Sequence, residues 1–139
     1  MMLLMSAACL VLADQLTKAL AAQLLADRQS VRLSSHIHLC YARNAFGLAG
    51  VPSKRSALLI LWGVAFITLL LVVWDGRLFH HSVGRVALGA ALGGATSNLY
   101  DRLRRGAVID LVKVGWWPVF NLADVGITAG AIAAIWFIR

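Results

Sequence analysis

Asp110 and Asp124 have the residue type and the surroundings that acid–base chemistry needs. They are 14 positions apart and lie among apolar neighbours. Two carboxyl groups brought together in such surroundings cannot both ionise readily, so one pKa rises and the pair shares a proton. The protonated group can then polarise a carbonyl while the ionised group activates water. From spacing alone, a proton-binding or helix-capping role fits these two residues equally well.

The composition indicates that these residues belong to a membrane protein. The chain has 139 residues, enough for one domain, and 60 % of them are hydrophobic while 14 % are charged. Soluble domains have about 45–50 % and about 25 %, respectively. The net charge of +7 is spread between apolar runs and forms no stripe or arm. Anionic lipid headgroups, and not nucleic acid, are therefore the expected partners of the basic residues.

Four apolar segments approach the ~20 residues that a helix needs to cross a bilayer. We expect helices over roughly 1–25, 56–74, 86–103 and 119–138, in a single membrane-embedded domain spanning 1–139. The first segment has no Lys or Arg before its apolar run, so we expect a retained anchor and no cleaved signal peptide. Small residues at helical spacing predict a tight pair between the last two helices. These residues are Gly89/Gly93, Ala90/Gly94 and Gly126/Gly130.

The polar segment 26–55, between the first two expected helices, predicts extended structure. Residues 30–33 and 36–41 alternate between polar and apolar, which is the period of a half-buried strand. Gly47, Gly50 and Pro52 then interrupt regular structure. A small sheet or hairpin followed by a surface loop is therefore expected here. His36 and His38 share a strand face, but no third ligand is apparent, so no metal site is predicted.

Charged residues inside the expected helices need partners, because an unpaired charge within a membrane costs roughly 2.5–3.5 kcal/mol. Asp14 and Lys18 are four residues apart and can neutralise each other on one helix face. A second polar face is expected at the end of the third helix, from Asn98, Asp101, Arg102 and Arg105. Asp101 is expected to pair with a neighbouring arginine, whereas Asn98 and Arg102 could bind a substrate backbone or a lipid ester.

Four helices place the segment before the second helix and the segment before the fourth on the same side of the membrane. Asn44, Asp110 and Asp124 should therefore face one compartment, and both termini should face the other. Most Lys and Arg residues of the connecting segments lie on the Asp110 side. The positive-inside rule alone would place that side in the cytoplasm.

Four short motifs resemble those of the lipoprotein signal peptidases, or type II signal peptidases, in the same order along the chain. Residues 14–18 (DQLTK) resemble the family's D-Q-x-[ST]-K, and 97–102 (SNLYDR) resemble its G-N-x-x-D-R with Ser97 where glycine is usual. Residues 108–111 (VIDL) resemble the V-V-D-F box, and 120–124 (FNLAD) resemble F-N-x-A-D. The segment at Asn44 is shorter than the family's usual N-x-G-A-A-F.

The resemblance implies a membrane-embedded aspartic endopeptidase that removes the signal peptide from diacylglyceryl-modified prolipoproteins by cutting before the lipidated cysteine. The implied fold is an all-α membrane protein with four transmembrane helices and a small extracytoplasmic β-sheet or hairpin. No cofactor or metal is expected, and the protein is expected to be monomeric in the bacterial cytoplasmic membrane. The termini would be cytoplasmic and the active site periplasmic or at the outer face, against the charge bias.

The same resemblance implies a role for each residue of the motifs. Asp110 and Asp124 would be the catalytic pair, although the sequence does not assign which is the acid and which the base. Asn98, Arg102, Asn121 and Asn44 would bind substrate, and Asp14, Lys18 and Asp101 would support the fold. Without the resemblance, two alternatives stay open: a small proton-linked carrier with Asp14, Asp110 and Asp124 as proton sites, and a structural membrane subunit.

Overall fold

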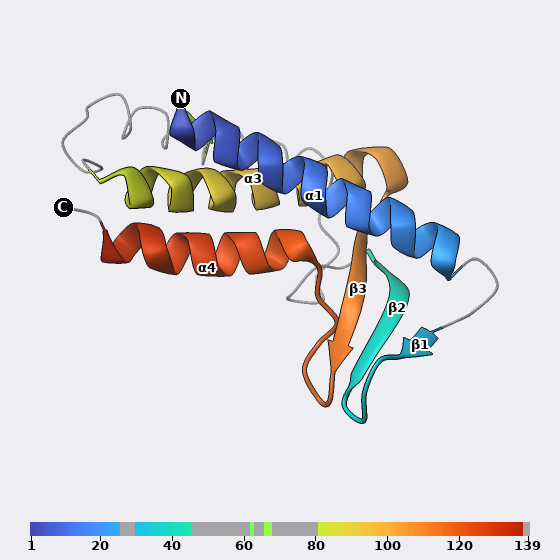
Figure 1. The fold of residues 1–139 in the computed structure, drawn as a ribbon. Coiled ribbons are helices and arrows are strands. Elements are labelled where there is room, and N and C mark those ends of the chain that lie inside the picture. The colour runs from blue at the N-terminus through green and yellow to red at the C-terminus, as the bar shows by residue number, and fades with distance from the viewer. Residues whose placement is uncertain (26–29, 46–61, 63–65, 68–80, 138–139) are drawn as a thin grey trace.

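The computed structural model describes residues 1–25, 30–45, 62, 66–67 and 81–137. These residues form the helices α1 (Met2–Leu24), α3 (Ser82–Arg105) and α4 (Leu122–Trp136) and the strands β1 (Ser30–Arg32), β2 (Ile37–Asn44) and β3 (Val108–Val114). Figure 1 shows α1 and α3 running toward the sheet and α4 running back from it. The sheet therefore lies at one end of the helices, and α1 begins and α4 ends at the other. The helix expected over 56–74 lies almost entirely outside the described residues.

Local chemistry sets the ends of the helices. Helix α3 ends at Arg105 because Gly106 adopts a left-handed conformation, with φ of 76°, and donates its N–H to the Arg102 carbonyl. Helix α4 begins at Leu122, three positions after the expected start at 119, because Asn121 caps it. The Asn121 side chain accepts from the Asp124 N–H, and the Asp124 side chain accepts from the Asn121 N–H.

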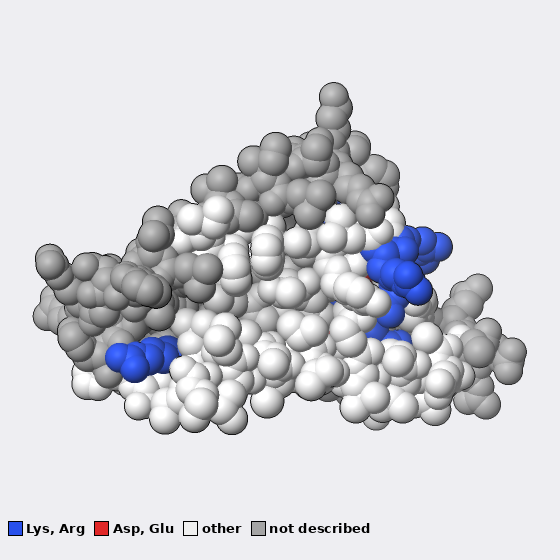
Figure 2. Space-filling view, turned by 90° about the horizontal axis from the view of Figure 1, so that it is seen from above, with Lys and Arg blue, Asp and Glu red and all other residues white. Residues whose placement is uncertain are grey.

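The surface of α1 reverses the pattern of a soluble protein. Leu12 and Leu24 are 70 % and 68 % exposed, whereas Asp14 and Lys18 are fully buried. Among the described helices, α1 is the one with both the length and the hydropathy to cross a membrane, and α4 is apolar but shorter. On the face shown in Figure 2, no Asp or Glu of the described residues is visible, and Lys and Arg lie toward the two ends. Apolar side chains outside and charges inside suit a protein surrounded by lipid.

Helix α3 packs closely against α4 through small residues, as the sequence predicts. A Cβ atom at Gly94 would overlap the Ala123 carbonyl, and one at Gly130 would overlap the Ala87 carbonyl. Each glycine therefore lets the two backbones approach more closely than any larger residue would.

The prediction was wrong for Gly89 and Gly93, which pack against α1 and not against α4. A Cβ atom at Gly93 would overlap the Ala7 carbonyl, and one at Gly89 would overlap the Leu3 carbonyl. Small residues on two sides of α3 thus hold it between α1 and α4. The sequence shows the small residues but not which neighbour each side meets.

The sheet is antiparallel, in the order β1-β2-β3. The expected hairpin within 26–55 corresponds to β1 and β2, whereas the sequence pattern predicts no third strand between the expected helices over 86–103 and 119–138. One apolar row crosses all three strands, with Val31 opposite Leu39 and Leu39 opposite Val112. This row packs against Ala21 and Leu25 at the end of α1.

Pairing of β2 with β3 places Asn44 opposite Val108. The segment that follows α1 and the segment that precedes α4 therefore meet at the same end of the helices. The sequence predicts that Asn44 and Asp110 lie on the same side of the membrane; the structure brings them into contact, with a hydrogen bond of 3.1 Å between the two side chains.

The close approach of α3 and α4 can be tested with a pair of substitutions on neighbouring positions. Gly130→Ile should lower the free energy of unfolding by about 2 kcal/mol or more, because backbone atoms of α3 block the new side chain. Ala131→Ile, on the exposed face of α4, should change it by less than about 0.5 kcal/mol. Denaturant unfolding in detergent micelles measures both, and equal effects would contradict the packing.

Candidate active site

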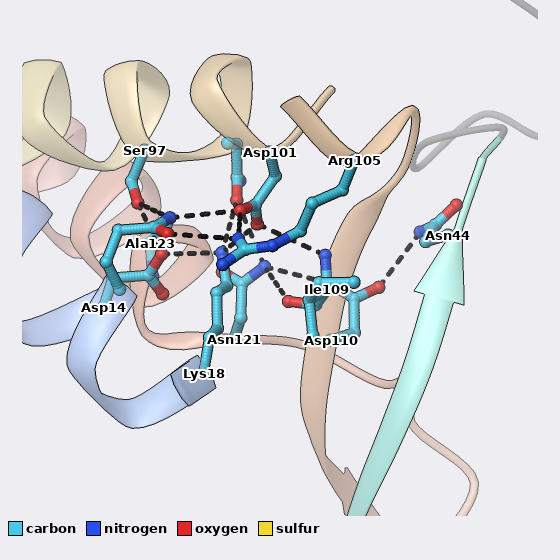
Figure 3. A network of polar contacts seen from close by, with 12 residues as sticks. Asp14, Lys18, Asn44, Ser97, Asp101, Arg105, Ile109, Asp110, Asn121 and Ala123 are labelled. Carbon is cyan, nitrogen blue, oxygen red and sulfur yellow. Dashed lines mark hydrogen bonds and ion pairs between the residues drawn. The ribbon is translucent and has the colours of Figure 1, made fainter. Parts of the chain in front are cut away.

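A neutral cluster of charged side chains is buried where α1 and α3 approach the sheet. The Lys18 ammonium lies 2.6 Å from Asp14 Oδ2 and 2.6 Å from Asp101 Oδ2, and all three side chains are at most 1 % exposed. Arg105, one turn after Asp101, pairs with the other oxygen of that carboxylate. Two carboxylates and two cations thus cancel, which a buried ionic group requires. Figure 3 shows this cluster with its dashed contacts.

Two neutral side chains complete the bonding of this cluster. Ser97 donates its hydroxyl to Asp14 Oδ2 at 2.6 Å. The Gln15 amide donates to Ser97 at 2.8 Å and to Asp101 at 3.1 Å, and its carbonyl accepts from Arg105 at 3.0 Å. Neither Gln15 nor Ser97 was predicted as a site residue. One feature of the sequence could have indicated a role for Ser97: it stands where the G-N-x-x-D-R motif usually has glycine. A serine hydroxyl can donate a hydrogen bond, whereas glycine has no side chain.

The cluster also fixes the start of α4. Asp14 Oδ1 accepts the Ala123 N–H at 2.9 Å, so a side chain of α1 satisfies a first-turn donor of another helix. Asp101 Oδ2 likewise accepts the Ile109 N–H of β3 at 3.3 Å. The two buried carboxylates therefore hold the backbone on which Asp124 and Asp110 are carried.

Asp124 lies in the first turn of α4 and receives hydrogen bonds from neutral donors. The Asn98 amide donates to Oδ1 at 2.8 Å, and the Asn121 backbone N–H donates to Oδ2 at 3.1 Å. The positive end of a helix dipole and these donors stabilise a negative charge at this position. Asn98 itself is held by Lys18, whose ammonium lies 3.4 Å from its carbonyl oxygen.

Asp110 lies on β3 and is 3 % exposed. The Asn121 amide donates to Oδ1 at 2.9 Å, and the Asn44 amide donates to Oδ2 at 3.1 Å. Burial raises the pKa of Asp110, and the nearby Asp124 raises it further, against the opposing hydrogen bonds from Asn44 and Asn121. Asp110 is thus a carboxyl group that holds a proton more readily than an exposed aspartate does.

Asn121 forms hydrogen bonds with both Asp110 and Asp124. Its side chain donates to Asp110, and its backbone N–H donates to Asp124. The same amide also lies 3.1 Å from the Asn98 carbonyl oxygen. Two aspartates from β3 and α4 therefore share one residue between them, and each retains oxygen lone pairs for a water or a substrate group.

Apolar hollows adjoin this pair. One of about 680 Å³ runs along α4 beside Asp124 and is lined by Trp116, Trp117, Phe120, Val125 and Ile132, among others. Another of about 390 Å³ lies between α1 and the sheet and includes Asn121. Among the described residues, no three His, Cys, Asp or Glu side chains are grouped as metal ligands. The site can therefore place an apolar group beside the carboxyl groups of Asp110 and Asp124.

The remaining predicted site residue, Arg102, lies apart from these contacts. It is half-buried in the last turn of α3, and its side chain makes no hydrogen bond or ion pair within the described part of the chain. The structure thus brings together Asn44, Asn98, Asp110, Asn121 and Asp124 and leaves the Arg102 guanidinium with capacity for a further partner.

Comparisons with known proteins agree with this geometry. The sequence profile of the signal peptidase (SPase) II family matches residues 6–139. Lipoprotein signal peptidases of Mycolicibacterium smegmatis and Mycobacterium avium are 36 % and 37 % identical over 96 % of this chain. The chain spans 59 % of the length of the first and 76 % of the second.

Two solved structures, each described as a bacterial membrane enzyme, have the same fold. One gives a TM-score of 0.78 with 27 % identity and the other 0.77 with 26 % identity. Each likeness covers 96 % of this chain, together with 84 % and 89 % of the respective solved chains. At these values the similarity extends over nearly the whole chain and includes the elements that carry the two aspartates.

The buried ammonium can be tested by removing its charge. Lys18→Met should lower the free energy of unfolding by about 3–5 kcal/mol, because Asp14 and Asp101 would face each other with one cation fewer. Lys113→Met, the same change at an exposed position on β3, should change it by less than about 0.5 kcal/mol. Thermal and denaturant unfolding in detergent report both, and a stable Lys18→Met protein would show that the cluster does not hold the fold.

Proposed function

This chain belongs to the signal peptidase II family, and on that premise we propose that it is an aspartic endopeptidase embedded in the bacterial cytoplasmic membrane. It removes the signal peptide from a prolipoprotein whose cysteine carries a diacylglyceryl group, by cutting the peptide bond before that cysteine. The observation that carries the proposal is the linkage of Asp110 and Asp124 through Asn121, at 2.9 and 3.1 Å.

The surroundings of the two carboxyl groups suit different roles. The raised pKa of Asp110 favours the protonated form, which can donate a hydrogen bond to the scissile carbonyl. Asp124 accepts hydrogen bonds from the Asn98 amide and the Asn121 N–H at the N-terminus of α4, and donors so placed suit a carboxylate that takes a proton from water. We therefore assign Asp110 as the acid and Asp124 as the base in the free enzyme. The two titrate as a coupled pair, so each pH limb reports on both.

Attack then proceeds without a covalent intermediate. Asp124 removes a proton from the water as its oxygen bonds to the carbonyl carbon, and Asp110 gives its proton to the developing oxyanion. As the tetrahedral intermediate collapses, the C–N bond breaks, a hydroxyl proton returns to Asp110 while the carbonyl re-forms, and the proton held by Asp124 passes to the leaving amine. The amides of Asn44, Asn98 and Asn121 keep both carboxyl groups oriented during these transfers.

The hollow along α4 suits the lipid part of such a substrate. Its lining is almost entirely apolar, and it reaches Asp124. An acyl chain placed there would lie next to the base, while Arg102 and Asn98 would bind the peptide backbone or an ester. In the proposed orientation the four-helix domain has its termini in the cytoplasm and the dyad at the periplasmic or outer face.

Replacement of either aspartate by its amide tests the dyad. Asp110→Asn and Asp124→Asn should each lower the rate of cleavage of a diacylated precursor by at least about 10³-fold, because neither amide can transfer the proton. Both variants should remain folded in the membrane, since each amide is nearly the same size as the carboxyl it replaces. Wild-type cleavage in either variant would remove that residue from the mechanism, and proton flux without proteolysis would favour a carrier.

Substitution of Asn44 tests the assignment of the acid. The hydrogen bond from Asn44 lowers the pKa of Asp110, so Asn44→Ala should raise that pKa. Activity is lost when the acid deprotonates, and the alkaline limb of the pH–rate profile should therefore move to higher pH. The limb would stay in place, or move to lower pH, if Asp110 were not the group that must be protonated.

A further inference from the structure

Basic side chains face one another across all three strands of the sheet. Arg32 on β1 is directly opposite His38 on β2, and His38 is directly opposite Lys113 on β3. Directly opposed residues project from the same face of an antiparallel sheet. We call this surface the basic face, defined by Arg32, His38 and Lys113. It is the reverse of the face on which Val31, Leu39 and Val112 pack toward α1.

No carboxylate of the described residues pairs with the cations of the basic face. Arg32 and Lys113 lie on either side of the His38 imidazole, so the basic face has positive charge available for an anion. The four acidic residues in the described part of the chain are all engaged in the site and cluster above. Ion pairs in the described part of the chain likewise involve only Asp14 and Asp101 as acids.

A polar hollow of about 450 Å³ lies on the basic face. It is lined by Ser30, Ser35, His36, His38, Cys40 and Lys113, with the Gly115 backbone. Within the described part of the chain, the side chains of Ser30, His38 and Lys113 make no hydrogen bond or ion pair. Hydroxyl, imidazole and ammonium groups thus surround one space with their donors available, and such donors match the oxygens of a phosphate group.

The hollow is separate from the dyad but electrostatically linked to it. Burial raises the pKa of Cys40, Lys113 lowers it, and Asp110 raises it. Cys40 therefore lies within the fields of both the cation of the hollow and the candidate acid. Arg32 and Lys113 are separated by two strand spacings, roughly 10 Å. Arg32 is not among the residues that line the hollow. Its Nε donates to the Ser34 carbonyl at 3.1 Å, which leaves the terminal N–H groups of the guanidinium for an ion held over His38.

We propose that the basic face is a binding site for a phosphate-type oxyanion, held by Arg32, His38, Lys113 and the Ser30 hydroxyl. The phosphate can belong to an anionic phospholipid headgroup or to a free phosphate, since both present the same oxygens. Binding there places a negative charge on the sheet beside β3, independently of peptide cleavage.

The first experiment uses inorganic phosphate on the purified full-length protein in detergent. Phosphate is titrated against chloride at constant ionic strength, so that general screening is the same throughout, and binding is followed by calorimetry. Lys113→Gln and Arg32→Gln should each weaken phosphate binding about tenfold, the effect of losing one charged hydrogen bond. Arg104→Gln, an exposed arginine at the end of α3, removes the same charge away from the sheet and should leave it unchanged.

The second experiment distinguishes the source of the phosphate. Native mass spectrometry compares retention of an anionic phosphatidylglycerol and a zwitterionic phosphatidylcholine by wild type, Lys113→Gln and Arg104→Gln. Anionic lipid retained by wild type and Arg104→Gln, and lost from Lys113→Gln, identifies a headgroup site. Inorganic phosphate binding with the same variant pattern and no lipid preference identifies a free-phosphate site.

Either pattern supports the proposal. Equal behaviour of Lys113→Gln and wild type in both experiments would overturn it. Binding of an acidic peptide, with neither phosphate nor phospholipid bound, would also overturn it and would point to a polypeptide partner. The variants remain measurable whether or not cleavage is detected, so failure here and failure of the peptidase proposal are distinguishable.

Discussion

The position of the Lys18 ammonium between Asp14 and Asp101 is the constraint on which the rest of the structure depends. Its contact with Asp14 lies within α1 and its contact with Asp101 joins α1 to α3; each is 2.6 Å long and buried from water. The same two carboxylates accept the Ala123 N–H of α4 and the Ile109 N–H of β3. One buried cation therefore sets the relative positions of four elements. Apolar contacts alone would fix these positions poorly, because apolar side chains contact lipid about as favourably as they contact each other.

The four described aspartates have different roles because their side chains have different hydrogen-bond and ion-pair partners. Asp14 and Asp101 form ion pairs with Lys18 and Arg105 inside the buried cluster. Asp110 and Asp124 instead accept hydrogen bonds from amides and backbone N–H groups, which orient a carboxyl group without pairing it with a cation. The cluster holds the surrounding backbone in place, and we propose that the second pair of aspartates beside it exchanges protons.

Local patterns in the sequence predicted much of the fold and the site. The spacing of Asp14 and Lys18 predicted their pair, and the apolar runs placed α1, α3 and α4 to within a few residues. The third strand was not predicted because 108–112 is a nearly continuous apolar run without a clear period. The helix that Gly93 contacts and the bond from Ser97 to Asp14 could not be predicted either, since both depend on how distant segments meet.

We expect Asp110 and Asp124 to hold one proton between them in the resting protein. Infrared spectroscopy of protein with ¹³C-labelled aspartate carboxyl groups, at neutral pH in lipid, measures this directly. We expect one protonated carboxyl band in the wild type, and its loss in Asp110→Asn. A spectrum in which every aspartate is ionised, or a band that persists in Asp110→Asn and Asp124→Asn alike, would contradict the claim.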